Sequence, residues 1–237
     1  MYRYIELEDF TVINGSLLRD AVISAAITIA NRKREVDELN VYPVPDGDTG
    51  TYMSMTIGNS VAELKRLDDK APVSEVASTA ASAFLRGARG NSGVILSLIF
   101  RGFSKGLSGC TEAGCENFAD ALQFGVEAAY KAVMKPVEGT ILTVVKAAAQ
   151  KAREIALETN DEVTFWQEIC TEAEAVLAQT WLDLPKHIVD LSFTDLFKKK
   201  ARELYPSLIE SEYSQLQYAA FLNLILETED GAVLWHC

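Results

Sequence analysis

The sequence predicts an all-α protein, and three observations carry that prediction. Hydrophobic residues recur at helical spacing near the N-terminus, where they are Leu18, Val22, Ala25 and Ile29. No stretch alternates apolar and polar residues with the two-residue period of a half-buried strand. Alanine-rich segments such as residues 77–83 suit close packing of one helix on another.

The expected helices are set by this spacing and by the breaks between them. Two prolines end the first helix before a stiff loop, and a glycine-rich break separates the third helix from the fourth. Gly139 and Thr140 lie at the start of the helix expected over 140–158. The helix expected over 162–179 is marked by apolar residues at helical spacing, Phe165, Ile169, Ala173 and Val176. Pro185 and Pro206 break the C-terminal part into short pieces. The expected ranges are 14–38, 49–67, 74–88, 92–106, 116–134, 140–158, 162–179, 194–204 and 210–227.

Residues 39–53 place two carboxylates one glycine apart. Pro43 and Pro45 stiffen the approach, and glycine between the two aspartates, Asp46 and Asp48, permits a sharp turn that brings both carboxylates to one point. Mg²⁺ takes one or two carboxylates, with waters and substrate phosphates completing its shell. The segment therefore predicts a magnesium site, and a helix-capping turn is the structural alternative.

Two further glycine-containing segments lead into helices, at residues 87–95 and 136–143. The N-terminus of a helix offers unpaired N–H groups and a positive dipole end, and glycine lets a phosphate approach the backbone. Both segments are candidate anion-binding sites. A tight turn between two helices remains the alternative for each.

Taken together, residues 39–53, 87–103 and 129–145 resemble the L-subunit domain of dihydroxyacetone kinases (the DhaL-like family). The variant they resemble best is the N-terminal nucleotide-binding domain of bacterial fatty acid kinase. The resemblance begins near Ile13 and fades after Thr180. It implies an up-and-down barrel of about eight helices that holds ADP or ATP through two Mg²⁺ ions.

The resemblance also assigns roles to residues. Asp46 and Asp48 would be metal ligands and carry the catalytic role, with Asn40 a candidate for the same shell. The residues that would contact the nucleotide are Thr49, Gly50, Thr51, Asn91, Ser92, Gly139, Thr140 and Leu142.

Two departures from the family pattern suggest impaired activity. Tyr52 stands where family members of this variant carry an asparagine, and a phenol can donate one hydrogen bond but cannot reproduce the donor and acceptor pair of an amide. The glycine-rich segment that closes over the nucleotide is absent after Thr180, where Asp190 is a candidate remnant. We expect residues 1–180 to form the nucleotide-binding domain and residues 181–237 to form a diverged helical segment that packs on it or on a partner.

The composition limits the classes of partner that the chain is expected to bind. The net charge of −12 argues against nucleic acid and anionic membrane surfaces. Four scattered cysteines, the absence of an apolar leader and the absence of a long apolar run predict a cytoplasmic chain with free thiols and no membrane span.

Three functions are compatible with the sequence. The first is a kinase domain that phosphorylates a fatty acid presented by a separate fatty-acid-binding subunit. The second is the nucleotide-binding subunit of a dihydroxyacetone (glycerone) kinase, acting with a K-type subunit. The third is a non-catalytic nucleotide-binding or scaffold module. The phosphoryl acceptor and the oligomeric state are not determined by the sequence, and a homodimer is one of the open states.

Overall fold

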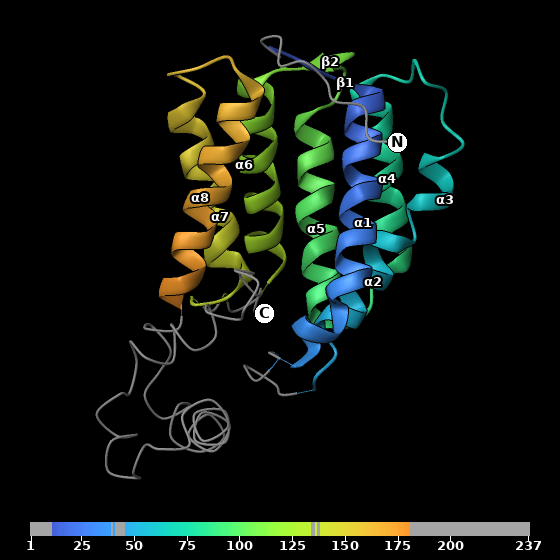
Figure 1. Cartoon of the computed structure of the whole chain (residues 1–237), viewed down its shortest axis with the longest axis vertical. Helices are drawn as coiled ribbons and strands as arrows, with labels where there is room; N and C mark the ends of the chain where they lie inside the picture. Colours follow the sequence, from blue (N-terminus) through green and yellow to red (C-terminus); the bar gives the residue numbers. More distant parts are fainter. Residues whose placement is uncertain (1–10, 39, 41–45, 134–135, 137, 181–237) are drawn as a thin grey trace.

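A computed structural model describes residues 11–38, 40, 46–133, 136 and 138–180 of the chain (Figure 1). Almost all of the elements in this part are helices, which confirms the all-α prediction. The expected helices at 194–204 and 210–227, like Asp190, lie outside the described residues. In chain order the elements are β1 (Ile13–Asn14), α1 (Gly15–Glu38), α2 (Thr49–Gly58), α3 (Val61–Leu64), α4 (Val73–Gly87), α5 (Gly90–Gly106), β2 (Glu112–Ala113), α6 (Cys115–Ala132), α7 (Ile141–Ile155) and α8 (Glu162–Thr180).

The long helices run alternately up and down (Figure 1). Helices α4 to α8 each pack on the next along the chain, while α1 packs on α2 and α4. This topology puts the starts of α2, α5 and α7 at the lower end of the bundle in Figure 1, and the β1–β2 pair at the upper end.

Two details differ from the expected elements. The single helix expected over 49–67 is divided into α2 and α3 at Ser60, whose backbone N–H (3.0 Å) and Oγ (2.8 Å) both donate to the carbonyl oxygen of Ile57. The neighbouring Asn59 Nδ2 donates to the carbonyl oxygen of Ala83 on α4 (2.6 Å). In addition, residues Ile13–Asn14 and Glu112–Ala113 pair as two short antiparallel strands. A two-residue strand leaves no periodicity in the sequence.

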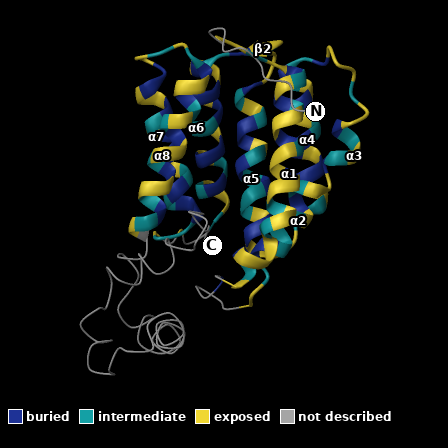
Figure 2. Ribbon diagram, in the orientation of Figure 1, coloured by how far each residue is buried: buried dark blue, intermediate teal, exposed yellow. Residues whose placement is uncertain are grey.

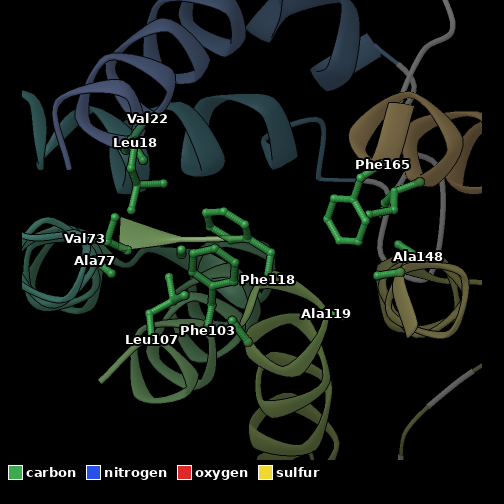
Figure 3. Packing of buried hydrophobic residues seen from close by; sticks show 14 of the residues in the cluster. Leu18, Val22, Val73, Ala77, Phe103, Leu107, Phe118, Ala119, Ala148 and Phe165 are labelled. Carbon is green, nitrogen blue, oxygen red and sulfur yellow. The ribbon is translucent and has the colours of Figure 1, made fainter. Parts of the chain in front are cut away.

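The buried faces of the helices form one main core (Figure 2). Its centre is a set of aromatic and aliphatic side chains from α4, α5, α6 and α8, in which Phe103 and Phe118 have ring centroids 6.1 Å apart (Figure 3). Burial of such rings supplies much of the free energy that holds a helical bundle together. On α1, Leu18 and Val22 are buried as expected, but Ala26 takes the position expected for Ala25.

Helices α5 and α6 approach closely because small residues meet at their interface. A Cβ at Gly102 would lie 2.6 Å from the carbonyl carbon of Phe124, and a Cβ at Gly125 would lie 2.9 Å from the carbonyl oxygen of Ile99. Side chains larger than hydrogen would therefore push the two helices apart. Within the described part of the chain, no helix is both long enough and apolar enough to cross a membrane.

Candidate functional site

Three helices begin beside one cavity of about 620 Å³ at the lower end of the bundle. Helix α2 contributes its N-cap and first residue, α5 its first turn, and α7 its N-cap and first two residues. The described residues that line the cavity are Asn40, Asp46, Asp48, Thr49, Tyr52, Gly90, Asn91, Ser92, Val94, Ile95, Leu98, Ala132, Val133, Thr140, Ile141 and Leu142.

The convergence of helix starts makes this end of the molecule suited to anions. Each helix presents N–H groups and the positive end of its dipole at its first turn. The caps of α2 and α5, Asp48 and Arg89, make no side-chain capping hydrogen bond, whereas Thr140 Oγ1 accepts from the N–H of Leu142 (3.3 Å). Both glycine-containing segments singled out in the sequence thus reach the same cavity from different elements.

The carboxylates of Asp46 and Asp48 also face this cavity. Between them Gly47 has φ +63°, a left-handed conformation that glycine adopts at little cost and that turns the chain sharply. No lysine or arginine is among the described residues that line the cavity. A phosphorylated ligand placed at the helix starts would therefore meet uncompensated carboxylates unless a cation lay between them.

The donor set fits a cation that keeps part of its water shell. Asp46 and Asp48 supply two carboxylates at the cavity. Among the described residues no group of three or more His, Cys, Asp or Glu side chains could hold a metal ion, so these carboxylates form only part of a coordination shell. Two carboxylates with room for water and phosphate oxygens suit Mg²⁺, which prefers oxygen ligands and releases its waters reluctantly.

Asn40 holds the loop rather than pointing a spare oxygen at the cavity. Its side chain is buried, and its Oδ1 atom accepts hydrogen bonds from the N–H of Asp48 (3.2 Å) and from Thr49 Oγ1 (3.0 Å). An amide oxygen has two lone pairs, and both are used here. This geometry favours a positioning role for Asn40 over a place in a metal shell.

Asp37, in the last turn of α1, is a residue that the sequence patterns did not reveal. Its Oδ1 atom accepts from the N–H of Thr51 (2.9 Å), and its Oδ2 atom accepts from Thr51 Oγ1 (2.7 Å). Thr51 is expected at the nucleotide, but its N–H and hydroxyl are both bound to the Asp37 carboxylate, and Thr51 does not line the cavity. No spacing in the sequence indicates this pair, because its members are fourteen residues apart on two helices.

Two glycines expected at the nucleotide likewise do not line the cavity. Gly50 lies against α1, where a Cβ would overlap the carbonyl oxygen of Lys33, so this glycine permits helix packing. Gly139, with φ +79°, shapes the turn before α7. Its N–H donates to Thr143 Oγ1 (3.0 Å), and that hydroxyl donates to Glu138 Oε2 (2.6 Å).

The rest of the cavity wall is apolar. Val94, Ile95 and Leu98 of α5 face the ends of α6 and α7 across it. Arg89, the N-cap of α5, is exposed and does not line the cavity, and its Nη1 atom donates to the carbonyl oxygen of Ala88 (2.7 Å). A polar rim of helix starts beside an apolar wall fits a ligand that carries phosphate at one end and an apolar or aromatic group at the other.

These features define a helical domain with an anion-favouring cavity at one end. The chain belongs to the DAK2 domain family, which it matches over residues 43–187, more than half of its length. The family is associated with kinases and its domains bind ADP or ATP, so the chain is a nucleotide-binding module of the dihydroxyacetone kinase L-subunit type.

Curated relatives of the chain are named for no particular reaction. Uncharacterized proteins of Staphylococcus aureus strains USA300, COL and MRSA252 are each 48% identical to this chain over 168 residues. The alignment covers 71% of this chain and 30% of each relative. The chain thus spans less than a third of the length of these relatives.

Proposed function

We propose that the chain is an ATP- and Mg²⁺-dependent phosphotransferase domain whose acceptor is presented by a separate subunit. The observation that carries this proposal is the meeting of three helix N-termini and two carboxylates around a cavity without a lining lysine or arginine among the described residues. Helix starts favour the phosphates, whereas the carboxylates require a cation, and Mg-nucleotide satisfies both.

In this proposal each part of the cavity has a task. The first turns of α5 and α7, with Asn91, Ser92 and Thr140, bind phosphate oxygens through N–H and hydroxyl donors. Thr49 keeps the carboxylate loop in place through Asn40. The apolar wall of α5 excludes water from one side of the ligand. Phosphoryl transfer needs mainly positioning and charge neutralisation, so the absence of a lining histidine or lysine from the described residues is compatible with it.

Asp46 and Asp48 would hold the magnesium ions, two in the related kinases. Bound there, Mg²⁺ would neutralise the negative charge that the phosphates and carboxylates share, and it would act as a Lewis acid towards a phosphoryl oxygen. The contribution of the protein is to keep both carboxylates on one side of the cavity. The left-handed turn at Gly47 and the hydrogen bonds to Asn40 do this.

For the acceptor we propose a fatty acid, phosphorylated on its carboxylate to an acyl phosphate. The support is the string Pro-Val-Pro-Asp-Gly-Asp-Thr-Gly at residues 43–50, which resembles the fatty acid kinase variant more than the dihydroxyacetone kinase one. A carboxylate acceptor needs no base to remove a proton. Dihydroxyacetone, with a K-type subunit, is the alternative acceptor, and a non-catalytic module is the alternative favoured by Tyr52 and by the missing glycine segment.

The test combines the chain with Mg-ATP and either a fatty-acid-binding subunit carrying a fatty acid or a K-type subunit carrying dihydroxyacetone. Acyl phosphate is trapped with hydroxylamine as the hydroxamate, and Asp48→Asn is the matched control. We expect hydroxamate only when the wild-type chain, Mg-ATP and the fatty-acid-binding subunit are all present. Phosphate transfer to dihydroxyacetone would support the alternative kinase. Nucleotide binding without transfer to either acceptor would support the scaffold module.

A further inference from the structure

We infer that Tyr52 is a positioning residue that ties the carboxylate loop to the first turn of α5, an inference that rests on the proposed nucleotide site. Tyr52 lies in α2, one helical turn after Asp48, and its backbone N–H donates to the carbonyl oxygen of Asp48 (2.8 Å). Its side chain lines the cavity together with Asp46 and Asp48.

The phenol group acts on the carboxylate. The Tyr52 hydroxyl is hydrogen-bonded to the Asp48 side chain, and this contact, with the negative charges of Asp48 and Asp46, raises the pKa of the phenol. A neutral phenol has one proton to donate. It therefore occupies one acceptor site of the Asp48 carboxylate, fixes the rotation of that group and leaves the other acceptor sites for a cation.

The ring acts on α5. Gly90, the first residue of α5, has φ +60°, and a Cβ there would lie 2.6 Å from Cε2 of Tyr52 and closer still to Cδ2. The ring thus occupies the space that a side chain at position 90 would need. Asn91 and Ser92, the anion-binding candidates, come directly after Gly90.

A second contact one turn further along repeats this arrangement. A Cβ at Gly93 would lie 2.5 Å from Thr56 Oγ1, and that hydroxyl donates to the carbonyl oxygen of Tyr52 (2.7 Å). Two glycines of α5 therefore face two side chains of α2 that are four residues apart. Tyr52 belongs to both contacts, so it sets the distance between the carboxylates and the helix start that would receive the phosphates.

These contacts argue against the impaired activity that Tyr52, in place of the asparagine of the family pattern, suggests from the sequence. Asparagine ends at Cγ, and so it cannot cover Gly90 and reach Asp48 as tyrosine does. The phenol and the ring can be tested separately. Tyr52→Phe removes only the hydroxyl, Tyr52→Asn removes both contacts, and Gly90→Ala displaces the ring while tyrosine is kept.

The experiment titrates Mg²⁺ against the full chain at fixed ADP and measures the concentration that gives half-maximal binding. We expect Tyr52→Phe to raise this concentration by about tenfold, the usual effect of losing a hydrogen bond to a charged group. Tyr52→Asn and Gly90→Ala should raise it at least as far. Phe124→Leu, which changes a half-exposed ring on α6 outside the cavity, is the control and should change it less than about twofold.

A spectroscopic readout separates positioning from a general loss of structure. Mg²⁺ should change the near-ultraviolet circular dichroism of tyrosine in the wild type but not in Tyr52→Phe or Asp48→Asn, while far-ultraviolet helicity stays the same in all three. A Tyr52→Asn variant that binds Mg-ADP as tightly as the wild type, or more tightly, overturns the positioning role alone. A wild type that binds no Mg-ADP overturns the proposed function, and the role of Tyr52 with it.

Discussion

Asp37 and Asp48 illustrate how two like side chains at one end of the molecule acquire different tasks. Both oxygens of Asp37 are used within the protein, one on the N–H and one on the hydroxyl of Thr51. Asp48 caps α2 without a side-chain capping hydrogen bond and faces the cavity. Asp37, with both oxygens taken by Thr51, stabilises the fold, whereas Asp48, which also contacts the Tyr52 hydroxyl, faces a ligand space and keeps acceptor sites for binding.

Substitution of each by asparagine should separate these tasks. Asp37→Asn puts an amide N–H₂ against one of the Thr51 donors, and we expect it to lower the free energy of unfolding by about 1–2 kcal/mol. Asp48→Asn should change that free energy by less than about 0.5 kcal/mol but weaken Mg²⁺-dependent ADP binding more than about tenfold. Urea unfolding and calorimetry measure the two quantities. Equal losses of stability in the two variants would contradict this division.

At the scale of elements, the turn before α7 can be tested with a matched glycine. Gly139 and Gly109 have nearly the same left-handed φ, +79° and +82°. Gly139 precedes the start of α7 at the cavity, whereas Gly109 lies in the connection between α5 and β2. No atom lies within 4 Å of the position that a Cβ would take at Gly109. Alanine at either position should cost about 1 kcal/mol of stability from backbone strain. We expect only Gly139→Ala to weaken Mg-ADP binding as well, by about tenfold, because it disturbs the turn that aims the helix start.

Titration of both variants with Mg-ADP, alongside thermal unfolding, checks this expectation. If both variants bind as the wild type does, the Gly139 segment is only a turn. Gly125, a glycine inside a helix, is unsuitable as the comparison, because any Cβ there meets the carbonyl oxygen of Ile99 at 2.9 Å and would separate α5 from α6.

At the scale of the whole molecule, the end of the bundle opposite the cavity holds a different kind of polar group. Glu162, at the start of α8, is only 3% exposed. Its Oε2 atom accepts a hydrogen bond from the indole N–H of Trp166 (3.1 Å), whereas its Oε1 atom has no hydrogen-bond partner in the described part of the chain. Burial raises the pKa of Glu162 from 4.5 to about 6, and burial together with the nearby Glu162 charge raises the pKa of Cys115 to about 12. This end should therefore give stability a pH dependence that is independent of the nucleotide.

The sign of this dependence is set by linkage. Because the folded pKa of Glu162 is above its unfolded value, its contribution to stability is complete below about pH 4.5 and is lost as pH rises through about 6. The amplitude is about 2 kcal/mol. We expect the difference in unfolding free energy between wild type and Glu162→Gln to change by this amount across that pH range, measured by urea unfolding. Parallel curves for the two proteins would show that Glu162 does not titrate there.

Local sequence predicted most of the helices and the three helix starts at the cavity. Periodicity and capping act within a few residues, so Asp48 before α2, the glycine-rich break before α5 and Thr140 before α7 could all be recognised without a structure. The division of residues 49–67 could not be recognised in this way. Asn59, the C-cap of α2, bonds Ala83, which lies 24 residues away, and no local pattern indicates that contact.

The helical class, the family and the segments from which the site is built can all be read from the order of the amino acids. Helix packing, in contrast, settles which atoms of those segments face the cavity: Gly50 packs on α1 and Thr51 binds Asp37, whereas Tyr52 lies over Gly90 beside Asp48. The physical reason is that helix formation depends on neighbours a few residues apart. The orientation of a side chain depends instead on helices that are brought together from distant parts of the chain.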